Sequence, residues 1–272
     1  VLHLLYSRFW HKVLYDLGLV NTKEPFQRLV NQGMILGEDG QKMSKSRGNV
    51  INPDDIIKEY GADSMRVYEM FMGPLEVSKP WATAGLVGVS RFLERLWALG
   101  EKPLAETPEA AGLSGEETQN ILRLLHKTIK KVTDDTATLN FNTAISAMMV
   151  YSSELAKLER LPRSFWEPLV QMVGPYAPHL AEELWEKLGH QESISKSQWP
   201  RYDESLAADN EATIVVQVNG KIRDKFTAPV GTAKSELEKT ALALPGIQKW
   251  LEGVTIAKVI SVPDKLVNIV VK

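Results

Sequence analysis

The sequence predicts a multidomain protein in which an α/β segment comes first, an α-helical bundle follows, and a small α+β domain comes last. Two observations predict this class. Apolar residues recur three and four positions apart through the middle of the chain, as in amphipathic helices. After the middle segment, the period changes to the alternation and β-branched content of strands. We therefore expect domains at 1–80, 81–190 and 211–272, with a connector at 191–210.

Composition narrows the classes of protein that the chain can represent. Its 272 residues are 44% hydrophobic and 24% charged, with a formal net charge of -2, which is ordinary for a globular protein with a real core. Because there is no cysteine, a disulfide framework, a cysteine-type zinc site and a thiol nucleophile are excluded. No apolar run is long enough to cross a bilayer. We expect a cytoplasmic protein, since a chain without cysteine suits a reducing compartment.

The first segment, 1–80, combines a helix with glycine-rich and polar turns. Apolar residues at helical spacing begin at Leu2, and Gly18 ends the run. A short apolar stretch at 34–36 predicts a strand, and a polar loop follows it. Asn52, which stands before a proline, predicts a helix start, because its side chain can cap the first turn and proline fits the first helical position.

The second segment, 81–190, has helical periodicity throughout. The predicted helices are 86–99, 116–133, 143–158, 165–173 and 176–188. Short connections with prolines between these long helices predict a bundle. Trp97, Phe165, Trp166 and Trp185 share the apolar spacing, so we assign them to the core rather than to stacking on nucleic-acid bases.

The last segment, 211–272, has the pattern of a ββαββ module. The predicted strands and helix are 213–218, 221–226, 235–244, 254–262 and 266–271. An Asn-Gly pair at 219–220 is a strong signal of a two-residue hairpin turn. Lys221, Arg223 and Lys225 alternate along one predicted strand, so we expect them to project from one face and to be able to follow a phosphate backbone. On charge alone, the alternative is that these three residues lie on a sheet face that is exposed to solvent and binds no RNA.

The stretch most informative about chemistry lies between Gly40 and Gly48. It reads Lys42-Met43-Ser44-Lys45-Ser46. Compact ammonium groups can meet phosphate oxygens, small hydroxyl side chains leave room for them, and flanking glycines let a loop close. This composition suits a polyphosphate ligand such as ATP. On composition alone, a solvated basic loop is the alternative.

The same five residues match, without departure, the signature loop of the class I aminoacyl-tRNA synthetases. Other segments resemble the leucyl-tRNA synthetases of bacterial type in particular, and they occur in that family's order along essentially the whole chain. The segments that resemble the leucyl enzymes are 3–12, 69–75, 177–185 and 216–223, whereas 49–53 and 60–63 resemble the wider class I subgroup that charges aliphatic amino acids and methionine. The resemblance implies that 1–80 is the carboxy-terminal part of a Rossmann-like class I catalytic domain, followed by an anticodon-binding-type bundle and a tRNA-binding domain.

The resemblance also implies a reaction and the residues that serve it. Such a ligase joins leucine to the α-phosphate of ATP, which is expected to enter with Mg²⁺, releases pyrophosphate, and passes the leucyl group to tRNA(Leu). Lys45 is then the main phosphate contact and Lys42 its helper in catalysis. Met43 is expected to anchor the loop by packing, and Ser44 and Ser46 to bind phosphate or shape the backbone. We predict no metal site in the protein itself.

Further assignments follow from the same resemblance. His3 is expected beside the leucine pocket, although a core histidine on the first helix is the alternative. Lys221, Arg223 and Lys225 are expected to contact the elbow of the tRNA, and the bundle is expected to serve as a docking surface. We expect the protein to be a monomer.

One motif is missing from the sequence. The partner motif of class I enzymes, His-x-Gly-His, does not occur, and the chain starts without methionine. We therefore expect a part of a longer enzyme, with the adenine site and editing domain upstream, that cannot charge tRNA alone. Two alternatives remain: a part of a valyl-, isoleucyl- or methionyl-tRNA synthetase, which shares the loop and the bundle, or a stand-alone tRNA-binding protein.

Overall fold

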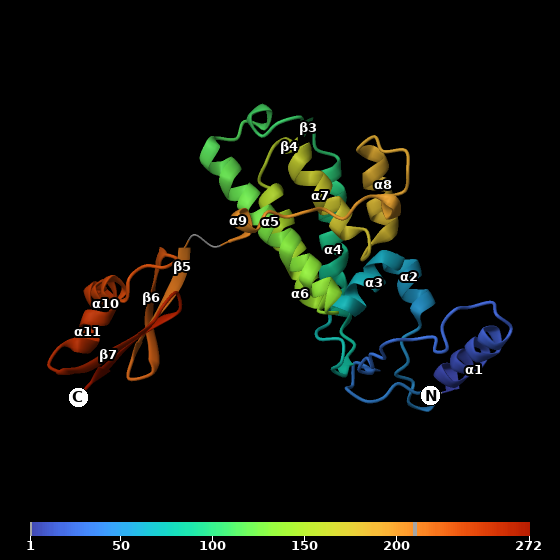
Figure 1. Ribbon diagram of the computed structural model, residues 1–272, viewed down its shortest axis with the longest axis horizontal. Coiled ribbons are helices and arrows are strands. Elements are labelled where there is room, and N and C mark those ends of the chain that lie inside the picture. The colour runs from blue at the N-terminus through green and yellow to red at the C-terminus, as the bar shows by residue number, and fades with distance from the viewer. Residues whose placement is uncertain (1, 209–210) are drawn as a thin grey trace. The chain divides into compact units, whose positions relative to one another are not determined.

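The computed structural model describes residues 2–208 and 211–272, which form two compact units (Figure 1). The first unit contains 1–102, 132–157 and 169–197, and the second contains 103–131, 158–168 and 198–272. Within the described ranges, no helix combines the length and the apolar character that a membrane span requires. The domain boundaries expected from the sequence stay predictions. Val1 and the last two residues of the expected connector, 209 and 210, lie outside the described residues.

The first unit begins with a helix, as the sequence predicts. α1 spans Leu2–Asp16, and Gly18 ends it with a φ of 73°, a left-handed conformation that glycine adopts without strain. None of the residues described in α1 is buried. Arg8 and Lys12 hold the segment after α1 through ion pairs with Glu24 of 2.7 and 3.1 Å. Hydrogen bonds from these two side chains lower the pKa of Glu24 to about 2.

Two short strands and two helices surround the predicted polar loop. β1, Ile35–Leu36, pairs in parallel with β2, Lys79–Pro80, which confirms the expected strand. In the described residues, the strand content of this segment is limited to these two strands. α2, Pro53–Tyr60, begins at Asn52, whose side chain accepts a hydrogen bond from a first-turn amide as predicted. α3, Ala62–Phe71, has no counterpart among the predicted elements.

Five longer helices confirm the helical prediction for the middle of the chain. They are α4 at Thr83–Gly100, α5 at Gly115–Ala137, α6 at Phe141–Leu155, α7 at Arg163–Val173 and α8 at Pro178–Lys187. Within the first unit, α3 packs against α4, α6 and α8, and fully buried side chains such as Leu86, Leu96 and Ile145 form the core. The core follows from apolar residues that recur at helical spacing.

Three of the four aromatic residues assigned to the core are buried, namely Phe165, Trp166 and Trp185. Trp97 is 39% exposed, and the Nζ of Lys187 lies 4.2 Å from the centre of its ring. The core assignment is therefore wrong for Trp97, because its ring lies at the surface in a cation–π contact instead of among apolar side chains.

Residues of the expected connector are held on helices of each unit. The short helical turns of the chain are η1 at Lys45–Arg47, η2 at Glu109–Ala111, η3 at Ile194–Lys196 and α9 at Glu204–Ala207. In the first unit, Glu182 on α8 accepts a hydrogen bond of 3.0 Å from the Ile194 amide. In the second unit, Lys130 on α5 forms a 2.5 Å ion pair with Glu204. The second unit also contains a short parallel strand pair, β3 at Leu104–Ala105 and β4 at Leu161–Pro162.

The carboxy-terminal module of the second unit is a four-stranded sheet with two helices. Its elements are β5 at Glu211–Val218, β6 at Lys221–Pro229, α10 at Lys234–Ala243, α11 at Pro245–Leu251, β7 at Ile256–Val262 and β8 at Leu266–Val271. The strand order is β6-β5-β8-β7, and only the β5–β8 pair is parallel. The predicted ββαββ order therefore needs one correction. Pro245 starts a second helix, because proline fits a first helical position.

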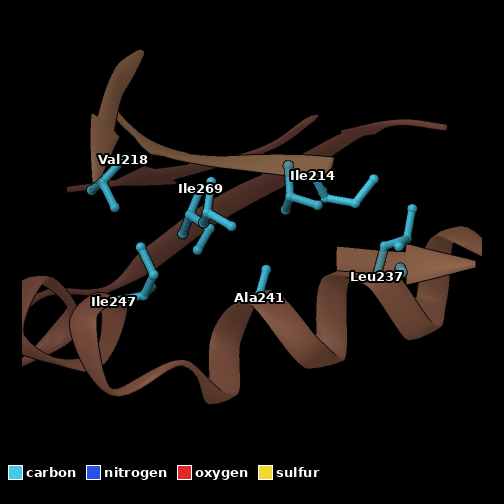
Figure 2. Close-up of a cluster of buried hydrophobic side chains, with 9 residues drawn as sticks. Ile214, Val218, Leu237, Ala241, Ile247 and Ile269 are labelled. Carbon is cyan, nitrogen blue, oxygen red and sulfur yellow. The ribbon is translucent and has the colours of Figure 1, made fainter. Parts of the chain in front are cut away.

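One face of this sheet packs on the two helices through apolar side chains (Figure 2). Alternate residues of β5 and β8 point toward α10 and α11, as strand geometry requires. The buried cluster consists of Ile214, Val216, Val218, Ala228, Leu237, Ala241, Ile247, Val267 and Ile269. The predicted hairpin turn is confirmed, with φ values of 49° at Asn219 and 77° at Gly220.

Candidate functional site

The signature loop starts from a tight turn at the end of β1. Leu36 forms an isolated antiparallel bridge with Lys42, and the Gly37 amide donates a 2.8 Å hydrogen bond to the Gln41 carbonyl. Gly40 closes the turn with a φ of 71°. A side chain at Gly37 would place its Cβ 2.7 Å from a carboxylate oxygen of Asp39. A larger residue at Gly37 would therefore have to displace the side chains of Asp39 and Asn49, which join the two sides of the loop.

Asn49 fixes the two sides of the loop to each other. Its Oδ1 accepts a 2.9 Å hydrogen bond from the Ser44 amide. Its Nδ2 donates to both carboxylate oxygens of Asp39 at 3.1 Å. Hydrogen bonds from the Gln41 amide and the Asn49 side chain lower the pKa of Asp39. Asp39 and Asn49 thus shape the loop. Neither role was predicted from the sequence, although Asn49 belongs to a matched flanking segment.

Lys45 and Ser46 lie on a 3-10 turn that Ser44 precedes. η1 is stopped by Gly48, which has a φ of 68° and donates its amide to the Lys45 carbonyl. The Oγ atoms of Ser44 and Ser46 lie 3.2 Å apart. Nη1 of Arg47 donates to the side chain of Gln41 at 3.3 Å. These contacts join the two hydroxyl groups to each other and the guanidinium to Gln41, and neither contact involves the ammonium group of Lys42 or Lys45.

The structure brings Lys42 and Lys45 onto the same short loop with both side chains exposed. Within the described residues, neither ammonium group has a hydrogen-bond or ion-pair partner. Met43 and Ser44 are half-buried, whereas Ser46 is exposed. The half-buried position of Met43 is compatible with its expected packing role. Two free ammonium groups on a glycine-flanked loop can bind an anion such as a phosphate chain.

His3 is exposed on α1. Among the residues that the structure describes, no apolar core covers it, so this part of the chain does not support a core histidine. A place beside an amino-acid pocket stays a prediction. Within the described residues, no three His, Asp or Glu side chains are grouped as a metal site would require.

The three basic residues of β6 do not share one face, and the reason is a β-bulge. Val216 pairs with Asp224 and Gln217 with Ile222, so Arg223 has no partner on β5. Arg223 instead stacks on Trp250 of α11, with 3.5 Å between its guanidinium carbon and the ring centre. Arg223 thus lies on the helix side of the sheet.

The two lysines flank the bulge on opposite faces. Lys221 pairs with Val218, whose buried side chain points to the helix side, and Lys225 pairs with Val215, which lies between two buried residues and points to the open side. Cross-strand partners point to the same face of a sheet. The expectation of a single basic face was wrong, because an extra residue in one strand reverses the alternation beyond it.

Family comparisons cover most of this chain. Residues 6–76 match the family described as tRNA synthetases class I (I, L, M and V), and residues 118–238 match the anticodon-binding domain of tRNA ligase. The first match contains the signature loop together with β1, α2 and α3. The second contains α5 to α8 and the first two strands of the carboxy-terminal sheet.

Individual relatives match the whole chain. It is 58% identical to the leucine–tRNA ligase of Chlorobium phaeovibrioides and 56% identical to that of Chlorobaculum tepidum, in each case over 272 residues that are 100% of this chain and 34% of the relative. The chain thus spans about a third of the length of the curated relatives it matches.

A solved structure gives the same result. It is a crystal structure of the ternary complex of Agrobacterium radiobacter LeuRS with tRNA and LeuAMS, which matches with a TM-score of 0.72 and 34% sequence identity. The match covers 100% of this chain and 37% of that one. The alternatives of a valyl-, isoleucyl- or methionyl-type enzyme and of a stand-alone tRNA-binding protein are not favoured by these matches. By sequence and by structure, the chain belongs to the leucine–tRNA ligases of the class I aminoacyl-tRNA synthetases, of which it matches about a third.

Proposed function

We propose that the chain supplies the ATP loop and the tRNA-docking parts of a leucine–tRNA ligase, which converts ATP, leucine and tRNA(Leu) into leucyl-tRNA, AMP and pyrophosphate. The loop that carries Lys42 and Lys45 is the observation on which the proposal depends. It lies within the segment that matches class I tRNA synthetases, and Asn49 fixes its shape through a hydrogen bond with the Ser44 amide. The names of the relatives support leucine as the amino acid.

We expect the two lysines to act on the leaving group of the reaction, which is pyrophosphate. When the leucine carboxylate attacks the α-phosphate of ATP, negative charge grows on the departing pyrophosphate. A positive group that meets this charge only as it develops raises the rate rather than the affinity. Lys45, on η1, is proposed as the main contact, and Lys42, at the bridge with β1, as its helper. ATP is expected to enter as its magnesium complex, so the ion arrives with the substrate.

The RNA side of the proposal has two surfaces. The helical segment matches an anticodon-binding domain, and the related solved structure contains tRNA, which together support RNA docking by this chain. On the carboxy-terminal module, Lys221 and Arg223 lie on the helix side and Lys225 lies on the open side. We propose that Lys221 and Arg223 bind the RNA as one set, which leaves Lys225 outside it. A leucine-pocket role for His3, a monomeric state and a cytoplasmic location stay predictions.

The test is Lys45→Ala in the complete ligase, because the chain alone is not expected to charge tRNA. We expect ATP–pyrophosphate exchange to fall by roughly a hundredfold or more, while the KM for leucine changes little, since a lost transition-state contact costs about 2.7–4 kcal/mol. Lys58→Ala is the matched control, because Lys58 is an exposed lysine in the last turn of α2. An exchange rate equal to that of the unaltered enzyme would refute the proposal.

A further inference from the structure

Two carboxylates flank the signature loop, and each meets the start of a bundle helix. Glu38 lies just before the loop, and Asp63 lies in the first turn of α3. The helices they meet, α4 and α8, have alanine at the N-cap position, so neither has a side-chain cap of its own. The first amides of a helix have no partner within the helix, and carboxylates stabilise them.

Glu38 takes the place of the missing cap on α4. Its Oε1 accepts hydrogen bonds from the Thr83 hydroxyl at 2.7 Å and from the Thr83 amide at 3.3 Å. These bonds lower the pKa of Glu38. The buried Trp81 completes the contact, because its Nε1 donates to the Thr83 hydroxyl oxygen at 3.2 Å and its amide donates to the Leu36 carbonyl at 2.9 Å. The strand before the loop is thus bound to the first turn of α4.

Asp63 supplies the missing cap at the start of α8. It is 9% exposed, and its Oδ2 accepts a 2.8 Å hydrogen bond from the Leu180 amide in the first turn. Its Oδ1 lies 2.8 Å from Nδ1 of His179. A buried carboxylate with two such contacts fixes its own segment firmly, because loss of either contact leaves a desolvated charge.

The segment between these two contacts depends on them. All residues from 38 to 62 are described, and none of them is buried. Apolar packing therefore does not fix the position of the loop, and local polar bonds such as those of Asn49 only fix its shape. At the other ends of the same two helices, Lys187 of α8 pairs with Glu101 and lies over Trp97 of α4. α4 and α8 are thus joined directly at their carboxy-terminal ends.

We propose that Glu38 and Asp63 are positioning residues that seat the signature loop on α4 and α8, so that a movement of these two helices is passed to the loop. The proposal rests on the proposed function in two respects, which are that the loop acts on ATP and that the bundle docks RNA. Its consequence is that RNA docking on the bundle can change the position of the lysines without any contact between RNA and loop.

The direct test is amide hydrogen exchange in 39–52, measured by mass spectrometry on this chain. We expect Glu38→Ala to speed exchange in 39–52 by about fivefold, which is the typical effect of losing a helix cap, and Asp63→Asn to speed it as well. Glu38→Gln should restore slow exchange, since an amide oxygen can still accept from Thr83. Glu101→Ala is the control, because it removes a carboxylate from the far end of the same helices.

The possible results distinguish a specific role of the two carboxylates from a general loosening of the helices. Unchanged exchange in both Glu38→Ala and Asp63→Asn would overturn the proposal, and so would an equal increase in Glu101→Ala, which would indicate general loosening. Because Glu38 is exposed, its variant tests the proposal even if Asp63→Asn folds poorly. In the complete ligase, Glu38→Ala should raise the KM for ATP more than the KM for leucine. Faster exchange with unchanged ATP kinetics would refute the proposed ATP role and leave the seating of the loop standing.

Discussion

The signature loop and the carboxy-terminal sheet are held in place by different forces. The loop contains no buried residue from 38 to 49, and amide, carboxylate and hydroxyl groups give it its shape. One face of the sheet contributes to an apolar cluster in which Ile214, Val216, Val267 and Ile269 are fully buried. Substitutions in the loop should therefore change function with little loss of stability, whereas substitutions in the cluster should do the reverse. This difference suits a loop that moves during a reaction and a module that serves as a rigid surface.

The largest expected effect is on the sheet. Ile269→Ala should lower the free energy of unfolding of the module by about 2–5 kcal/mol, because it leaves a cavity beside a central strand. The measurement is amide exchange in β5 and β8, and exchange in 39–52 should stay unchanged. Ile260→Ala is the control, since Ile260 is 42% exposed on β7 and should cost little. Equal effects of the two variants would contradict the assignment of the core to the helix side.

The next effect concerns the loop. Asn49→Ala removes the hydrogen bonds to Ser44 and Asp39 and should lower kcat/KM for ATP in the complete ligase by about tenfold, which corresponds to about 1.4 kcal/mol. Global stability should change by about 0.5 kcal/mol or less, because no residue from 38 to 49 is buried. Gln41→Ala loses a single side-chain bond to Arg47 and serves as the control. Loss of stability without loss of ATP turnover would mean that Asn49 stabilises the fold and does not support the function of the loop.

The smallest effect separates the two faces of the sheet. Lys221→Ala with Arg223→Ala should weaken tRNA binding and reduce the slope of log affinity against log salt by about two, roughly one for each phosphate contact. Lys225→Ala should change the slope less, because one RNA backbone cannot follow both faces. Binding is measured over a range of salt concentrations. If Lys225→Ala has the larger effect, the RNA lies on the open face, and native affinity in every variant would remove these residues from the RNA site.

The sequence predicted the elements well where one local signal decides the structure. Periodicity located the five long helices, Asn52 marked a helix start, and the Asn-Gly pair at 219–220 marked a turn. It did not predict α11 or the bulge at Arg223. A bulge depends on how one strand meets its neighbour and on the stacking partner Trp250, and neither contact is visible in the order of residues.

The candidate site shows the same limit. The five residues of the signature loop were recognised from their chemistry and their resemblance to a family. Of the residues that hold this loop, Glu38 and Asp39 look like ordinary polar surface residues in the sequence, and Asn49 and Asp63 belong to matched segments that did not indicate their role. Their partners are amides and hydroxyl groups brought near by folding, up to 117 positions away for Asp63 and Leu180. Pattern reading therefore finds the reactive groups more readily than their supports.

The place of β8 in the sheet has a consequence for biosynthesis. β8 lies between β5 and β7, and its parallel pairing joins 215–218 to 266–269, which lie near the two ends of the module in sequence. The hairpin of β5 and β6 thus emerges from the ribosome long before the strand that must lie beside it. Until residues 266–271 have been translated, one edge of β5 lacks its hydrogen-bonded neighbour, and the buried cluster lacks Val267 and Ile269. The module should consequently fold late and in a single step, and truncations within β8 should give aggregation-prone products rather than shortened but native domains.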